Sequence, residues 1–219
     1  MKKTLLILAF VLSLILAFSI VSLASETENT YYVVESEDSA LAGTLKEEGK
    51  NVVGISKLYT SASNSIAENT TYFISQFEGQ TLNLILAENV SYSTGNDTGP
   101  RATGIRIDKA VTVNVYFNGH SWWIPDDNNY SGFFVNHEDA SLTLIGNRTI
   151  EEVSAPLDLS NVSAKSKSDK IDYYGGFVGI YVETGDLTIK NAVIAGHDEI
   201  IYQRESNARG TSTDRKSVV

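Results

Sequence analysis

Residues Gly104–Ile150 read GIRIDKAVTVNVYFNGHSWWIPDDNNYSGFFVNHEDASLTLIGNRTI. Two short runs of this stretch have an apolar residue at every second position: Val111, Val113, Val115 and Phe117 in the first, and Leu142 and Leu144 in the second. The first run leads into Asn118-Gly119 and the second into Gly146-Asn147, which are pairs typical of turns. Because a period of two puts alternate side chains on one face, both runs predict strands with one buried side.

Similar runs recur along the chain. They begin near Leu82, Val111, Leu142 and Leu187, at separations of 29, 31 and 45 residues. The best internal match aligns Ser141–Ile150 with Asp186–Ile194, and each is preceded by a strand that begins with glycine, Gly132–Val135 or Gly179–Val182. Self-similarity at this period predicts an array of stacked units, with the additional residues of the longer repeats in loops such as 126–131 and 151–174.

The other expected elements precede or interleave with this array. A helix over Ser36–Glu48 is predicted to end at Gly49, and a second helix over Ser63–Phe77 begins with a capping-box pattern, Ser65 and Glu68. Strands are expected at Tyr31–Val34, Asn51–Tyr59 and Thr81–Leu86.

The N-terminus has the pattern of a secretory signal peptide. Lys2 and Lys3 precede an apolar run from Leu5 to Leu23, and small residues around Ala24 predict cleavage after that residue. We therefore expect a secreted or cell-surface protein with no stable membrane span after cleavage. The chain has no cysteine, and its 17 basic against 27 acidic residues make nucleic acid an unexpected partner.

The expected helix Ser63–Phe77, the step Glu78–Leu82 into a strand, and FNGHSWWI at Phe117–Ile124 resemble the entrance of the pectate-lyase-like superfamily, which includes adhesin-like surface proteins. The resemblance covers roughly 63–202. It implies an all-β chain that forms a single-stranded right-handed parallel β-helix, a solenoid with an N-terminal helical cap. The runner-up fold is a β-sandwich, which regular short strands would also support.

This interpretation divides the chain into a signal peptide (1–24), a leader or capping region (25–62), β-helix coils (63–202) and a disordered or artefactual tail (203–219). The last six residues, Asp214–Val219, resemble the translation of a common sequencing-adapter read, so we expect the genuine sequence to end by about Thr213 and further coils to be missing. A natural basic tail is the alternative. The interior is expected to hold Leu82, Leu84, Val111, Val113, Val115, Leu142, Leu144, Leu187 and Ile189.

One cluster is a candidate ligand site. Asp126 and Asp127 follow Trp122 and Trp123, and carboxylates beside indoles could hold a sugar ring or a Ca²⁺ ion. Since Trp122 and Trp123 are successive strand residues, one is expected in the core and the other at the surface. A solvated turn is the competing interpretation of the two aspartates, and the sequence predicts no other cofactor or metal.

Histidines and sequons complete the candidate residues. The three histidines, His120, His137 and His197, lack metal-ligand spacing. Six Asn-x-Ser/Thr sequons begin at Asn69, Asn89, Asn96, Asn129, Asn147 and Asn161. Of these, Asn96, Asn129 and Asn161 are expected in loops and Asn147 in a turn of the array.

The resemblance and the leader together predict a secreted or cell-surface module with a structural or adhesive role, binding an extracellular glycan or protein. The alternative is the N-terminal part of a polysaccharide lyase or glycoside hydrolase whose catalytic coils are missing. Catalysis of that kind needs two carboxylates close together, and no such constellation is evident in the sequence.

Overall fold

The structure, a computed structural model, describes residues 29–61, 73–91, 103–124, 132–149, 152, 168–175, 178–196, 199–203 and 217–218. The chain divides into two compact units, Met1–Thr30 and Tyr31–Val219, and nearly all described residues belong to the second. The expected signal peptide lies outside the described residues. None of the helices in the described part is long and apolar enough to cross a membrane.

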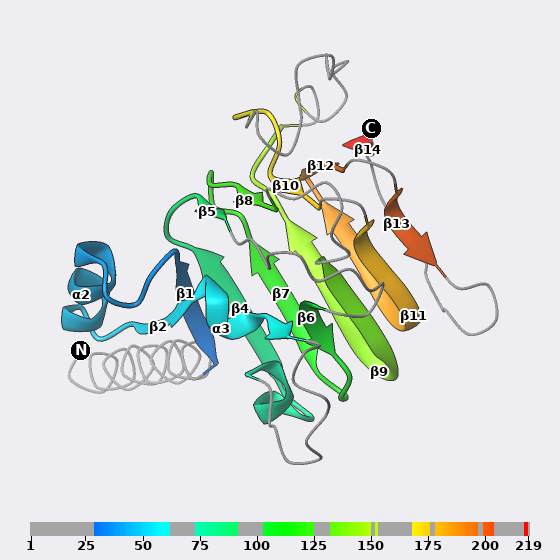
Figure 1. Cartoon of the computed structure of the whole chain (residues 1–219), viewed down its shortest axis with the longest axis horizontal. Helices are drawn as coiled ribbons and strands as arrows, with labels where there is room; N and C mark the ends of the chain where they lie inside the picture. Colours follow the sequence, from blue (N-terminus) through cyan, green and yellow to red (C-terminus); the bar gives the residue numbers. More distant parts are fainter. Residues whose placement is uncertain are drawn as a thin grey trace, which may run out of the picture. The chain divides into compact units, whose positions relative to one another are not determined.

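Most described residues form two sheets, whose strands run side by side in Figure 1. The larger sheet has nine strands. Seven follow the order β13-β11-β9-β7-β4-β1-β2, while β6 pairs with both β9 and β3. Its strands are β1 (Thr30–Val34), β2 (Asn51–Gly54), β3 (Thr60–Ser61), β4 (Thr81–Leu86), β6 (Thr103–Ile107), β7 (Thr112–Tyr116), β9 (Phe133–Ile145), β11 (Val178–Lys190) and β13 (Glu199–Gln203).

The smaller sheet has five short strands in the order β14-β12-β10-β8-β5, and all of their pairs are parallel. They are β5 (Val90–Ser91), β8 (Trp122–Trp123), β10 (Tyr173–Tyr174), β12 (Val193–Ala195) and β14 (Ser217–Val218).

The predicted alignment of the repeats is confirmed at the level of strand pairing. Val113 pairs in parallel with Leu82 on one side and with Leu142 on the other. The strand portions of the best-matched repeats also pair in register: Ser141 is the partner of Asp186, and the pairing continues residue by residue until Ile145 meets Lys190. Equivalent residues of successive repeats therefore lie side by side in the larger sheet.

The predicted single-stranded right-handed parallel β-helix is wrong. The described strands form two open sheets, and across the described ranges they make neither a solenoid nor a closed barrel. The reason lies in β9 and β11, each of which runs for 13 residues through both apolar runs of its repeat. The β-helix prediction placed the two apolar runs of each repeat in separate strands of a coil. In the structure both runs belong to one strand of the larger sheet.

The runner-up β-sandwich does not describe the structure either. Sandwich sheets are built from antiparallel pairs. Here the pairs that join β4, β7, β9 and β11 are parallel, and the antiparallel pair is the short contact of β3 with β6.

One apolar cluster joins the two sheets. It contains Leu82 and Leu84 of β4 together with Trp122 of β8 and Tyr173 of β10. Seven of the predicted interior residues are buried: Leu82, Leu84, Val111, Val113, Val115, Leu142 and Leu144. The other two, Leu187 and Ile189, are half-buried and pack against the same cluster. Burying one such side chain stabilises the fold by about 1.5–3 kcal/mol.

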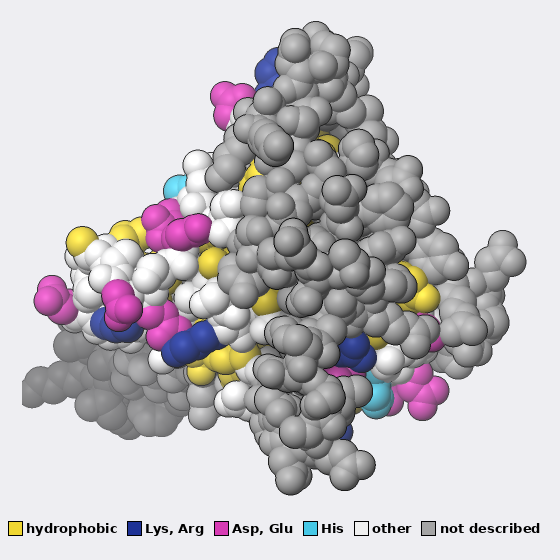
Figure 2. Space-filling view, in the orientation of Figure 1, with side chains coloured by type: hydrophobic (Ala, Val, Ile, Leu, Met, Phe, Trp, Pro, Cys, Tyr) yellow, Lys and Arg dark blue, Asp and Glu magenta, His cyan; other side chains and the backbone are white. Residues whose placement is uncertain are grey.

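The described side chains that are visible on one face of the molecule are of mixed character. In the view of Figure 2, apolar side chains of the described residues appear as small separate areas between polar and charged ones.

The turns after the strands need particular residues. Asn118 and Gly119 both have positive φ, 53° and 80°, so the predicted turn after β7 is confirmed. Gly146 is required for a different reason: a Cβ at this position would lie 2.0 Å from the backbone oxygen of Asn191 in the next repeat. The glycine allows two successive turns to approach closely.

The first predicted helix forms as α2 (Ala40–Glu47), but it begins at Ala40 and not at Ser36 as predicted. The Ser39 side chain accepts a hydrogen bond from the backbone N–H of Ala42 at 3.1 Å, which caps the helix N-terminus. Gly49, with φ of 77°, follows the last turn as a C′ residue does.

The prediction of one strand over Asn51–Tyr59 is wrong in its second half. The chain forms β2 and then the short helix α3 (Ile55–Leu58). Ile55 and Leu58 are three residues apart and both are buried in the main cluster, so one helical turn places both side chains inward.

The second predicted helix, Ser63–Phe77, falls mostly on residues outside the described ranges, including its capping box. Its described end is a 3₁₀ helix, η1 (Ile74–Phe77). The Phe73 ring beside it packs edge-on against Tyr31 of β1, with ring centroids 5.0 Å apart.

Candidate functional site

The outer side of the larger sheet carries polar side chains in register. Because Leu82 and Leu84 are buried in the core, Thr81 and Asn83 point to the opposite side of β4. The same alternation continues across β7, β9 and β11. We call the resulting sets the outer polar rows: Asn83, Asn114, Thr143 and Thr188 in the first, and Thr81, Thr112, Ser141 and Asp186 in the second.

Most side chains of the outer polar rows are half-buried by their neighbours, and Thr81 and Asp186 are exposed. Within the first row, Asn114 Nδ2 donates a hydrogen bond to Asn83 Oδ1 at 3.0 Å. Among the contacts of described residues, this bond uses one of the two N–H donors of the Asn114 amide. The rows therefore combine cross-strand stabilisation with remaining hydrogen-bonding groups at the surface.

A third row flanks the first on the same side of the sheet. It consists of Ile85, Tyr116, Ile145 and Lys190, at the ends of the same four strands. The first three are half-buried. A phenol ring beside a line of amides and hydroxyls offers both an apolar surface and hydrogen-bonding partners.

Farther along β9, an aromatic row also lies on the outer side. The Phe134 ring has the Arg106 guanidinium 4.7 Å from its centroid and the Tyr181 ring 5.0 Å away. Phe134 is 8% exposed. Since its ring is already covered by these neighbours, this row stabilises the sheet and offers little aromatic surface to a ligand.

The predicted ligand cluster is only partly described. Asp126 and Asp127 lie outside the described residues. Both tryptophans are fully buried, so the expectation that one of them reaches the surface is wrong.

The two indoles belong to different apolar clusters. Trp122 lies in the main cluster, and its Nε1–H donates to Tyr59 Oη at 3.1 Å. Trp123 stacks on Tyr174, with ring centroids 4.5 Å apart, in a second cluster. Successive residues of β8 point in opposite directions as expected, but an apolar cluster covers each side.

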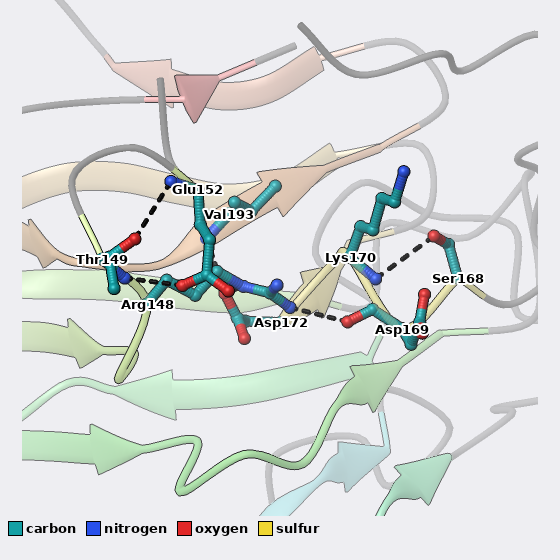
Figure 3. A network of polar contacts seen from close by, with 8 residues as sticks. All are labelled: Arg148, Thr149, Glu152, Ser168, Asp169, Lys170, Asp172 and Val193. Carbon is teal, nitrogen blue, oxygen red and sulfur yellow. Dashed lines mark hydrogen bonds and ion pairs between the residues drawn. The ribbon is translucent and has the colours of Figure 1, made fainter. Parts of the chain in front are cut away.

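A network that sequence reasoning missed joins the turn after β9 to the segment before β10 (Figure 3). Arg148 Nε donates to Asp172 Oδ2 at 2.6 Å, and Arg148 Nη2 donates to the backbone oxygen of Asp169 at 2.8 Å. Asp172 Oδ2 also accepts the backbone N–H of Val193 at 2.7 Å. Asp172 is 2% exposed and is buried among the described residues, and its Oδ2 atom accepts two of these bonds.

The periphery of this network is exposed. The backbone N–H of Thr149 donates to Glu152 Oε2 at 2.7 Å, and this bond lowers the pKa of Glu152. Nothing in the spacing of Arg148 and Asp172, 24 residues apart in the sequence, indicated that they would meet. The three hydrogen bonds of Arg148 and Asp172 make the pair a structural tie between two segments.

The described part of the chain lacks a group of three or more His, Asp or Glu side chains that could hold a metal ion. His137 Nδ1 accepts the backbone N–H of Asp139, which is a local turn contact. His197 lies outside the described ranges.

The Tyr173 hydroxyl is buried and donates a hydrogen bond to the backbone oxygen of Gly179 at 2.7 Å. Burial, with Tyr59 nearby, raises the pKa of this hydroxyl well above the ordinary value of a tyrosine.

Comparisons with protein-family models, with curated proteins and with solved structures found no match to this chain. The chemistry of the outer polar rows is therefore the main guide to function. The sequence contains a signal for these rows: Thr81-Leu-Asn83, Thr112-Val-Asn114, Ser141-Leu-Thr143 and Asp186-Leu-Thr188 each place two polar residues around one aliphatic residue.

Proposed function

We propose that the chain is a binding module of a secreted or cell-surface protein, and that its outer polar rows hold an extended, uncharged glycan. The observation that carries this proposal is the in-register line Asn83–Asn114–Thr143 on the outer side of the larger sheet. The leader-like segment after Lys2 and Lys3 supports the location.

The spacing of the rows suits a repeating ligand. Neighbouring strands of a sheet lie about 4.8 Å apart. That distance is close to the length of one pyranose residue in an extended chain. A glycan that runs across the strands can thus present one sugar to each of β4, β7, β9 and β11.

The chemistry of the side chains fits the same ligand. Hydroxyl and amide groups both donate and accept hydrogen bonds, as sugar hydroxyls do. Tyr116 adds an apolar ring at the flank of the rows, on the same strand and side as Asn114. Charge is confined to one end of the rows, at Asp186 and Lys190, so a polyanion has no line of cations to follow.

The test is binding of the purified protein to a panel of soluble neutral and acidic polysaccharides by affinity electrophoresis, followed by titration calorimetry. The decisive variant is Asn114→Ala combined with Tyr116→Ala. The matched control is Thr44→Ala, which also removes a polar side chain but lies on the exposed side of α2.

We expect at least one neutral glycan to bind, with the double variant at least tenfold weaker and the control unchanged. A loss of about 1.4 kcal/mol of binding free energy corresponds to that factor. Binding that is equal in the double variant, or no binding to any neutral glycan in the panel, would contradict the proposal. Thermal melts of each variant establish that the loss is not caused by unfolding.

A further inference from the structure

Two of the six sequons fall on described turns, and their surroundings differ. One is Asn89-Val90-Ser91, which leads into β5. The other is Asn147-Arg148-Thr149, which follows β9. Attachment of an N-linked glycan needs an accessible asparagine amide with a hydroxyl residue two positions later.

In the second sequon the side chains alternate in a way that suits attachment. Arg148 points inward to Asp172, with 17% of its side chain exposed, and fixes the backbone of the tripeptide. Asn147 and Thr149 on either side of it are exposed. The middle residue therefore anchors the turn while both residues that define the sequon face outward.

The Asn147 amide is also without a hydrogen-bonding partner among the described residues. Within the described ranges its side chain makes no hydrogen bond, and its Nδ2 lies beside Gly119, 3.7 Å from where a Cβ of that residue would be. Asn147 is an exposed residue. The Thr149 hydroxyl accepts a bond from the Glu152 backbone N–H at 3.2 Å and keeps its own proton as a donor.

The first sequon is more constrained. Asn89 is exposed, but its Oδ1 accepts the backbone N–H of Ser121 at 2.8 Å. Ser91 is a half-buried residue of β5, paired with Trp123, and its backbone N–H is bound by Glu35 Oε2 at 2.7 Å. This tripeptide is thus part of the sheet framework. The tripeptide at Asn147 lies outside the strands and is held through Arg148 and through the contacts of Thr149 with Glu152.

We propose that Asn147 is an attachment site for an N-linked glycan. In the transfer, a bond forms between Asn147 Nδ2 and the anomeric carbon of the first sugar. The bond from that carbon to the pyrophosphate of a lipid-linked oligosaccharide donor breaks, the lipid pyrophosphate leaves, and a base takes one amide proton. This inference is independent of the ligand proposed for the outer polar rows.

The experiment is secretion of the full chain from a host that has an oligosaccharyltransferase, followed by site mapping. Peptide-N-glycosidase digestion in ¹⁸O-labelled water converts each glycosylated asparagine to labelled aspartate, which mass spectrometry of peptides locates. The variants are Asn147→Gln, Thr149→Val and Thr149→Ser, with Asn89→Gln as the control at the other described turn.

We expect the label at position 147 in the wild-type chain and in the Thr149→Ser and Asn89→Gln variants. Asn147→Gln and Thr149→Val should each lose the glycan of this site and retain any others. The proposal is overturned if position 147 is unlabelled while another sequon is labelled, or if the secreted chain carries no label at all. Since the wild-type chain is mapped first, the outcome does not depend on whether every variant folds.

Discussion

Arg148 Nε lies 2.6 Å from Asp172 Oδ2 and ties the turn after β9 to the residue before β10. The contact is largely buried, with 3% of the Asp172 side chain exposed. A buried ion pair is weak evidence for net stability, but removal of one partner leaves an uncompensated charge. This asymmetry makes the pair a sensitive probe of the fold.

Arg148→Ala should reduce the free energy of unfolding by about 3–5 kcal/mol, because Asp172 loses its charge partner while it remains buried. Urea denaturation monitored by tryptophan fluorescence measures the change. The control is Lys57→Ala, which removes a 2.7 Å contact to Glu37 from a lysine whose side chain is 63% exposed. That change should cost less than about 1 kcal/mol. Equal effects of the two variants would show that the Asp172 site is not buried as described.

Tyr59→Phe should destabilise the protein by about 1–3 kcal/mol, because it removes the acceptor of the buried Trp122 Nε1–H. The two rings keep their packing, so the loss reports the hydrogen bond. Chemical denaturation gives the free energy, and the Trp122 indole N–H resonance should shift in the NMR spectrum. An unchanged resonance and an unchanged midpoint would refute this placement of Trp122.

Two glycine variants should move stability in opposite directions. Gly146→Ala places a methyl group 2.0 Å from the Asn191 oxygen and should destabilise the chain by at least about 1–3 kcal/mol. Gly43→Ala, in the middle of α2 with nothing within 4 Å of the new atom, should stabilise it by about 0.5–1 kcal/mol. Thermal unfolding of the two variants side by side checks the signs, and the reverse order would mean that the turn and helix are misassigned.

Glu37 should contribute to acid sensitivity. Burial opposes ionisation of its carboxyl, but the hydrogen bonds from Lys57 and from the Gly54 N–H, with the charges of Lys57 and Lys46, lower its pKa overall. A lowered folded-state pKa gives stability that is present above the unfolded value of about 4.3 and is lost as the pH falls through the folded value. Glu37→Gln should therefore flatten the decline of stability below about pH 4.3. If wild type and variant lose stability in parallel below that pH, Glu37 is not the group responsible.

The sequence predicted local geometry well and the path between strands poorly. Alternation at Val111–Phe117 and at Leu142–Leu144 identified the buried side of β7 and β9, and repeat similarity identified Leu142 and Leu187 as neighbours. Periodicity reports which side of a strand is buried. It does not report whether the chain bends between two apolar runs or continues through both as one strand. For this reason the prediction of a β-helix was wrong at β9, where both runs belong to one strand.

The site was difficult to predict for a related reason. Trp122 and Trp123 stood out because of their size, yet what covers Trp123 is the ring of Tyr174, which is distant in the sequence. Asn114 and Thr143 are single polar residues in strands, which are common, so the sequence alone does not distinguish them. Their significance depends on register, because Asn114 pairs with Asn83 on one side and with Thr143 on the other, and this is apparent only when the strands are aligned.

The most direct test of the proposed glycan-binding role uses a label on the outer polar rows. The chain has no cysteine, so Thr143→Cys introduces a single thiol for an environment-sensitive fluorophore. Thr44→Cys, on the exposed side of α2, is the matched control. With a neutral glycan selected from the binding panel, we expect a saturable change in emission from the label at position 143 and none at position 44. A saturable change at position 44 alone, or at neither position while calorimetry shows binding, would contradict the proposed role.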